Sequence, residues 1–168
     1  NLLSATKKAD LHEEILKRVQ PGAKVLDLGC GDGSLLKLLE RHRNVEGQGI
    51  EINDAAVHLC VENGVHVFQG DIDSGLPDYP DQAFDIVILN QTLEQSRQVE
   101  LVLSEALRVG RRVIVGFPNF AHWSLRLHLF LLGKAPVSRT LPYSWFDSPN
   151  AHFLSTSDFI AYCRDRKI

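Results

Sequence analysis

The chain has 168 residues, 44% hydrophobic and 23% charged, an ordinary balance for one globular domain. A net charge of −3 without a long basic run argues against a nucleic-acid partner, and no apolar run approaches the ~20 residues of a membrane-spanning helix. Three cysteines without CxxC spacing and seven histidines without close ligand spacing favour neither disulfides nor a metal site. We therefore expect a single domain over residues 1–168, working in the cytoplasm with reduced thiols.

Strand patterns alternate with helix patterns along the first two thirds of the chain. The predicted strands are residues 23–29, 45–52, 65–72, 84–90 and 112–117. Residues 33–42 and 98–109 have apolar side chains at helical spacing, and a further helix is expected to be capped by Asp54 and ended by Gly64. Such alternation predicts βαβ units and a parallel sheet.

The regular alternation ends after Pro118. Residues 122–132 predict an amphipathic helix, and a last helix is expected to begin near Ser157, which can cap it. At residues 166–168 a new strand is expected to begin. The segment between the two helices holds four residues that could line an acceptor pocket or a partner surface, or form a small satellite core: Tyr143, Trp145, Phe146 and Asp147.

The first chemical motif is VLDLGCGDGSLL, residues 25–36. A strand ends, a glycine loop turns and a helix begins, so backbone N–H groups can approach a ligand closely. The spacing is GxGxG rather than the GxGxxG of dinucleotide folds. An acid two residues before the first glycine would repel a pyrophosphate but suits an ammonium group. The motif therefore favours S-adenosylmethionine over NAD, against the alternative of a purely structural turn. The predicted contacts are Asp27, Gly29, Cys30, Gly31 and Gly33.

The second motif is Glu51, which ends the second predicted strand 24 residues after Asp27. An acid at about this separation hydrogen-bonds ribose hydroxyls in nucleotide folds, and a carboxylate accepts more strongly than a neutral group. We assign Glu51 and the adjoining Ile52 to the cofactor site, with a plain surface carboxylate as the alternative.

Two further polar sites follow the third and fourth strands. In GDI, Asp71 could accept from an adenine amino group while the N–H of Ile72 meets a ring nitrogen, although Asp73 is close enough to be confused with it. Asn90 follows FDIVIL, at the carboxyl end of a strand, where ligands bind in open α/β sheets. These positions complete the predicted cofactor site.

No catalytic group can be assigned from the sequence. Cys30 beside the glycine loop is more typical of packing than of a nucleophile. His122 and His152 flank the region expected to cover the site, and each is interpreted as structural rather than as a general base. Methyl transfer can rest largely on proximity and orientation, so the lack of an assigned base does not decide between an enzyme and a binding protein.

Longer segments of the chain resemble one family. ADLHEEIL, VLDLGCGDGSLL, CVENGV, QGDID, FDIVILNQTLEQ, LRVGRRVIVGFPNFAHW, LPYSWFDSPNAHF and DFIAYC are similar to the methionine-biosynthesis protein W family, MetW, over residues 9–168. The specific parts are RVGRRVIVGFPNFAHW and LPYSWFDSPN, because other class I methyltransferases usually have a proline-glycine-glycine turn where this chain has Gly110-Arg111-Arg112.

The resemblance implies an α/β, Rossmann-like, doubly wound, mostly parallel sheet with helices on both faces, ending before strands six and seven of the usual sheet. It implies S-adenosyl-L-methionine or S-adenosylhomocysteine as the ligand, and support of a homoserine O-acyltransferase in methionine biosynthesis as the function. A methyltransferase acting on a small molecule is the alternative. A NAD-dependent oxidoreductase is disfavoured by GxGxG and Asp27.

Overall fold

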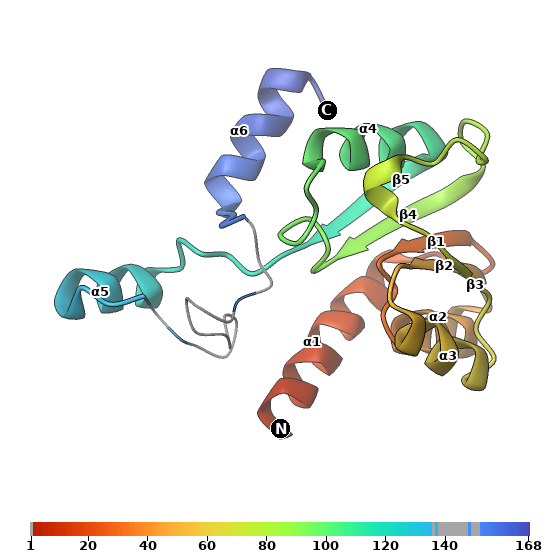
Figure 1. Ribbon diagram of the computed structural model, residues 1–168, viewed down its shortest axis with the longest axis horizontal. Coiled ribbons are helices and arrows are strands. Elements are labelled where there is room, and N and C mark those ends of the chain that lie inside the picture. Colours follow the sequence, from red (N-terminus) through yellow and green to blue (C-terminus); the bar gives the residue numbers. More distant parts are fainter. Residues whose placement is uncertain (1, 136, 138–147, 149–151) are drawn as a thin grey trace.

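The computed structural model describes residues 2–135, 137, 148 and 152–168, which form a five-stranded sheet flanked by helices (Figure 1). The strands lie in the order β3-β2-β1-β4-β5, and every pair is parallel. Their bounds are β1 (Lys24–Leu28), β2 (Glu46–Glu51), β3 (Val67–Gln69), β4 (Phe84–Asn90) and β5 (Gly110–Gly116). The helices are α1 (Leu2–Arg18), α2 (Ser34–Arg43), α3 (Asp54–Glu62), the 3-10 turn η1 (Ile72–Ser74), α4 (Val99–Val109), α5 (Trp123–Leu132) and α6 (Thr156–Arg166).

Both faces of the central strands are buried. Along β1, Val25 joins the apolar cluster under α1, α2 and α3, whereas Leu26 and Leu28 join the cluster under α4. Phe159 and Tyr162 of α6 pack against that second cluster. Continuous apolar runs in β1 and β4 follow from this arrangement, since alternate side chains enter different cores. The expected parallel α/β fold with helices on both faces is confirmed.

Strand β1 lies between β2 and β4. After β1 the chain adds β2 and β3 on one side of it, and after β3 it crosses over to add β4 and β5 on the other side. Loops from both halves of the sheet therefore diverge at the carboxyl ends of the strands, which creates a crevice in open α/β sheets. None of the described helices is long and apolar enough to cross a membrane.

Several predicted boundaries are wrong by a few residues. Helix α3 is capped by the side chain of Asn53, which accepts from the N–H of Ala56 at 3.1 Å, and not by Asp54. Helix α6 is capped by Ser155, whose Oγ accepts from the N–H of Asp158 at 3.1 Å, and not by Ser157. In each case more than one capping residue occurs at the helix start, and the backbone angles of the folded chain decide between them.

Two predicted strands are also corrected. A strand is expected over residues 65–72, but the structure has only the shorter β3 within this range. The strand ends at Gln69, and Asp71 caps the 3-10 turn that begins at Ile72. The strand expected to begin at residues 166–168 is not observed, since Arg166 belongs to α6 and Lys167 ends that helix in the left-handed conformation. Helix α1 had no counterpart among the predicted elements.

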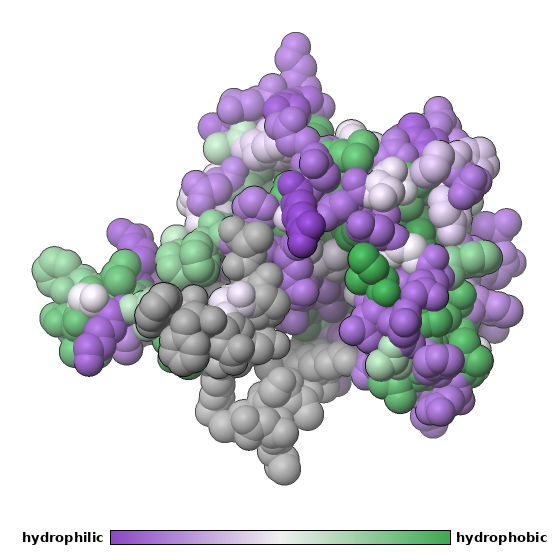
Figure 2. Space-filling view, in the orientation of Figure 1, coloured by the Kyte–Doolittle hydropathy of each residue, from purple (hydrophilic) through white to green (hydrophobic). Residues whose placement is uncertain are grey.

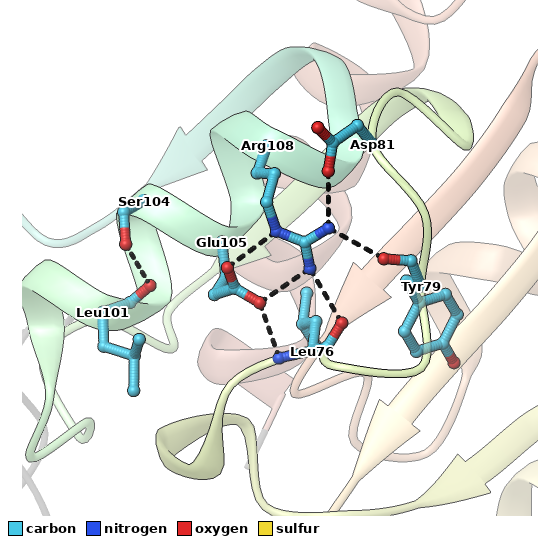
Figure 3. Close-up of polar contacts among 7 residues, drawn as sticks. All are labelled: Leu76, Tyr79, Asp81, Leu101, Ser104, Glu105 and Arg108. Carbon is cyan, nitrogen blue, oxygen red and sulfur yellow. Dashed lines mark hydrogen bonds and ion pairs between the residues drawn. The ribbon is translucent and has the colours of Figure 1, made fainter.

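A single guanidinium group holds the long loop between η1 and β4 against α4 (Figure 3). Arg108 donates to the carbonyl oxygens of Leu76 and Tyr79 and to Asp81, each at 2.8 Å. It also pairs with Glu105, whose second oxygen accepts from the N–H of Leu76 at 2.9 Å. The hydrogen bond from Arg108 lowers the pKa of Glu105 to about 2. The loop is thus fixed by charge-assisted hydrogen bonds.

Gly49 in β2 gives the first prediction. A Cβ added there would lie 2.4 Å from Sγ of Cys30 and 3.0 Å from its Cβ. Because the buried Cys30 side chain could move aside only by straining the core, we expect Gly49→Ala to lower the free energy of unfolding by about 1–3 kcal/mol, measured by urea denaturation. Gly70→Ala, whose new Cβ would meet its nearest atom at 3.4 Å, is the control. Equal stability of the two variants would contradict this explanation.

Candidate functional site

A cavity of about 710 Å³ opens at the carboxyl ends of β1 to β4, a size typical of small-molecule and cofactor sites. Loops that follow four different strands contribute to its wall, as the fold predicts. Six of the ten predicted contact residues line it: Gly29, Gly31, Glu51, Ile52, Asp71 and Ile72. The structure also brings in residues that the sequence motifs did not single out: Gln95, Ser96, Arg97 and Gln98.

The other four predicted contacts lie beside or beneath this wall. Asp27 is buried in β1, and Gly33 is the N-cap of α2. Cys30 is buried with its Sγ 3.8 Å from that of Cys60, and burial strongly raises the pKa of its thiol. This environment fits packing, as interpreted from the sequence. Asn90 is oriented toward β5, since a Cβ on Gly116 would lie 2.8 Å from its Oδ1.

The three glycines of GxGxG all have positive φ, of 75°, 56° and 72°. A Cβ on Gly29 would lie 2.8 Å from Cγ2 of Thr92, and one on Gly33 would lie 3.0 Å from Sγ of Cys60. These two glycines therefore allow close packing inside the protein. A Cβ on Gly31 would meet no protein atom within 4 Å, and Gly31 lines the cavity. Of the three glycines, Gly31 is the one that faces open space in the cavity.

The carboxylate of Glu51 connects the end of β2 to the glycine loop. Its Oε2 accepts from the N–H of Gly31 at 2.8 Å, and its Oε1 accepts from the N–H groups of Ile52 and Asn53 at 3.0 and 2.9 Å. A carboxylate offers about four lone-pair positions, so acceptor capacity remains for a ligand hydroxyl. Glu51 both shapes the cavity and faces it.

The two acids of GDID have different roles. Asp71 lines the cavity, and its Oδ1 accepts from the N–H of Asp73 at 2.9 Å, which caps η1. Asp73 accepts from the hydroxyl of Ser96 and from the N–H groups of Arg97 and Gln98. Burial alone would raise the pKa of Asp73, but these hydrogen bonds outweigh burial and lower it. Asp73 thus connects η1 to the loop before α4, and both segments line the cavity.

A buried carboxyl group that the sequence analysis missed lies next to this loop. Glu94 is 4% exposed, and no hydrogen-bond partner of its Oε2 exists in the described part of the chain. With Phe117, Pro118 and Phe120 it lines a void of about 10 Å³, space for about one water molecule. Burial raises the pKa of Glu94. The QTLEQ segment carried no signal for this, because the apolar side chains come from beyond β5.

The two histidines considered as bases both make hydrogen bonds within the protein. Nδ1 of His122 lies 2.8 Å from Oγ of Ser124, and Nε2 of His152 lies 3.0 Å from the carbonyl oxygen of Ser96. Among the described residues no group of three His, Cys, Asp or Glu side chains could hold a metal ion. The proposed aromatic pocket or partner surface around Tyr143, Trp145, Phe146 and Asp147 lies outside the described residues.

Solved structures with the same arrangement define the fold class. A SAM-dependent methyltransferase of Thermotoga maritima is similar with a TM-score of 0.71 and 21% identity, covering 98% of this chain and 72% of that one. A SAM-dependent methyltransferase of Archaeoglobus fulgidus is similar with a TM-score of 0.69 and 19% identity, covering 96% and 67%. The chain has the Rossmann-like fold of class I methyltransferases.

The family follows from sequence comparison. The family described as methionine biosynthesis protein MetW matches residues 8–168, and the chain belongs to this family. The chain is 39% identical over 155 residues to the bifunctional methionine biosynthesis protein MetXA/MetW of Rhodopirellula baltica, covering 87% of this chain and 25% of that protein. It is 34% identical over 102 residues to the ribosomal protein L11 methyltransferase of Burkholderia mallei, covering 60% and 34%. The chain therefore spans about a quarter to a third of these relatives.

Glu94 gives a prediction with a defined pH dependence. Because the folded state holds its proton more tightly than the unfolded chain does, stability is lost as the pH rises from the ordinary glutamate pKa, about 4.3, through the raised folded value. Glu94→Gln cannot ionise. We expect this variant to be more stable than the wild type at pH 8, by about 1–3 kcal/mol, and the difference to shrink toward pH 4.

Chemical denaturation at both pH values measures this difference. Glu62→Gln, at an exposed glutamate of α3, is the control and should follow the wild type at both. A Glu94→Gln variant whose stability relative to the wild type is the same at pH 4 and pH 8 would show that the Glu94 carboxyl is solvated in the folded protein.

Proposed function

We propose that the chain is a cytoplasmic S-adenosylmethionine-binding protein of methionine biosynthesis that supports the activity of a homoserine O-acyltransferase. Membership of the MetW family supports the pathway. The bifunctional relative, in which a MetW-like part and a MetXA part share one polypeptide, supports an acyltransferase partner. The observation that supports S-adenosylmethionine as the ligand is the cavity with Gly31 and Glu51 in its wall.

The residues present fit S-adenosylmethionine. Open space over Gly31 accommodates a ligand close to the backbone, and Glu51, which already accepts from three backbone N–H groups, keeps acceptor capacity for a ribose hydroxyl. Asp71 uses Oδ1 to cap η1 and keeps its other oxygen for an adenine amino group, with Ile52 and Ile72 as apolar neighbours. When bound, this ligand carries an activated methyl group on its sulfonium. The chain's own residues bind and orient it.

A methyltransferase acting on a small molecule is the second candidate. The observation that favours it is Glu94, a carboxyl whose burial raises its pKa, directly before Gln95 of the cavity wall. Carboxyl groups perturbed by burial cluster at functional sites. The two candidates differ in whether the bound ligand is consumed, so product formation separates them.

The ligand assignment predicts the effect of removing one carboxylate. We expect calorimetry to detect S-adenosylmethionine and S-adenosylhomocysteine but not NAD. Glu51→Ala should weaken binding of both by roughly 10- to 100-fold, since hydrogen bonds to charged groups contribute about 1.5–3 kcal/mol. Glu46→Ala, at the exposed opposite end of β2, is the matched control. Unchanged affinity in Glu51→Ala, or saturable binding of NAD alone, would show that this cavity is not an S-adenosylmethionine site of the proposed kind.

The functional assignment predicts a change in a second enzyme. The homoserine O-acyltransferase of the same organism should turn over faster with the full chain than without it, and the two should co-purify after co-expression. Titration with S-adenosylmethionine then measures whether the ligand changes that stimulation. If the chain leaves acyltransferase activity unchanged and instead converts S-adenosylmethionine rapidly on a small acceptor, the second candidate replaces the first.

A further inference from the structure

Helix α5 carries an apolar stripe that the rest of the described structure leaves uncovered. Only Leu125 of this helix is buried. Trp123, Leu127, Phe130 and Leu131 follow one another at i, i+4, i+7 and i+8, which places them on one side of a helix. Their exposure runs from 48% for Leu127 to 85% for Phe130. Four large apolar side chains on one short helix face form a patch of the kind that marks interaction sites.

The helix stands apart from the sheet. Figure 1 shows α5 at the left end of the molecule, beyond the loop that follows β5. Figure 2 shows hydrophobic side chains at the same end, with hydrophilic ones above and below them. A stripe at i, i+4 and i+7 on a projecting helix is the pattern by which an amphipathic helix enters a hydrophobic groove. Trp123 and Phe130 are of the residue types, aromatic and large, that anchor such contacts.

The charged residues on and next to α5 are basic. Residues 117–135 contain Arg126 and Lys134 and no Asp or Glu, although the whole chain has 18 basic and 21 acidic residues. Within α5, exposed Arg126 lies on the helix surface beside the stripe, and Lys134 follows the helix end. A groove that receives this helix is therefore best matched by apolar walls and an acidic rim.

We propose that α5 is the docking helix for the acyltransferase partner, and that its stripe of Trp123, Leu127, Phe130 and Leu131 enters an apolar groove with an acidic rim on that enzyme. This inference rests on the proposed function. Besides the charge, the bifunctional relative supports this occupant, because a MetW-like part there shares its polypeptide with a MetXA part. The cavity lies at the carboxyl ends of β1 to β4, and none of the four stripe residues lines it.

The test uses the full chain with Phe130→Asp and, separately, Leu131→Asp. A charge placed in the centre of the stripe should weaken binding of the purified acyltransferase by about 30-fold or more, the loss expected for a hot-spot residue. Stimulation of acyltransferase activity should fall in parallel, while affinity for S-adenosylmethionine stays unchanged and shows that the domain is folded. Val61→Asp on α3 is the matched control, since Val61 is 63% exposed and lies on a different surface.

The outcomes are separable. If the wild-type chain binds and stimulates the acyltransferase and both stripe variants do so equally well, the assignment of α5 as the docking helix is wrong and the proposed function stands. If the wild-type chain neither binds nor stimulates the enzyme, the proposed function fails and the inference with it. Concentration-dependent self-association that Phe130→Asp abolishes, or sedimentation of the wild type with anionic vesicles, would assign the stripe to a second copy or to a lipid surface and overturn the inference.

Discussion

The site depends on the hydrogen bonds between the glycine loop and the end of β2. The N–H groups of Gly29 and Cys30 both donate to the carbonyl oxygen of Ile50, at 2.8 and 3.2 Å, and that of Gly31 donates to Glu51 at 2.8 Å. A loop with three positive φ angles has no regular partners for its backbone groups, and buried polar groups that lack partners are costly. The end of the neighbouring strand supplies those partners, so this part of the cavity wall is hydrogen-bonded directly to the sheet.

The opposite wall of the cavity is built on α4. Asp73 accepts from the backbone just before this helix, and Arg108 near the end of the helix holds the loop that follows η1. The segment 71–82 has little regular structure of its own and gains its position from these two charged side chains. Glu105 strengthens this arrangement, since it pairs with Arg108 and accepts from Leu76 at the same time. The position of cavity residues such as Asp71 thereby depends on Asp73 in the cavity wall and on Arg108 outside it.

Local patterns predicted the order of strands and helices and the placement of GxGxG, because periodicity, caps and glycine turns are properties of neighbouring residues. Caps were misplaced where adjacent residues have similar side chains, as with Asn53 and Asp54. The roles of Asp73 and Glu94 could not be predicted, since each depends on residues more than 20 positions away along the chain. Periodicity predicted α5, but only the folded chain shows which of its faces remains exposed.

An effect of the cavity on α5, or of α5 on the cavity, needs a physical connection between them. The segment after β5 provides one. The N–H of Phe120 donates to the carbonyl oxygen of Leu154 at 2.9 Å, and the N–H of His152 donates to that of Glu94 at 3.1 Å, next to Gln95 in the cavity wall. A ligand that orders the loop around Gln95 would affect the His152–Glu94 end of this connection, and a partner bound to α5 would affect the end at Phe120. Any such coupling must be reciprocal, so the acyltransferase would change the affinity for S-adenosylmethionine by the same factor that S-adenosylmethionine changes acyltransferase binding.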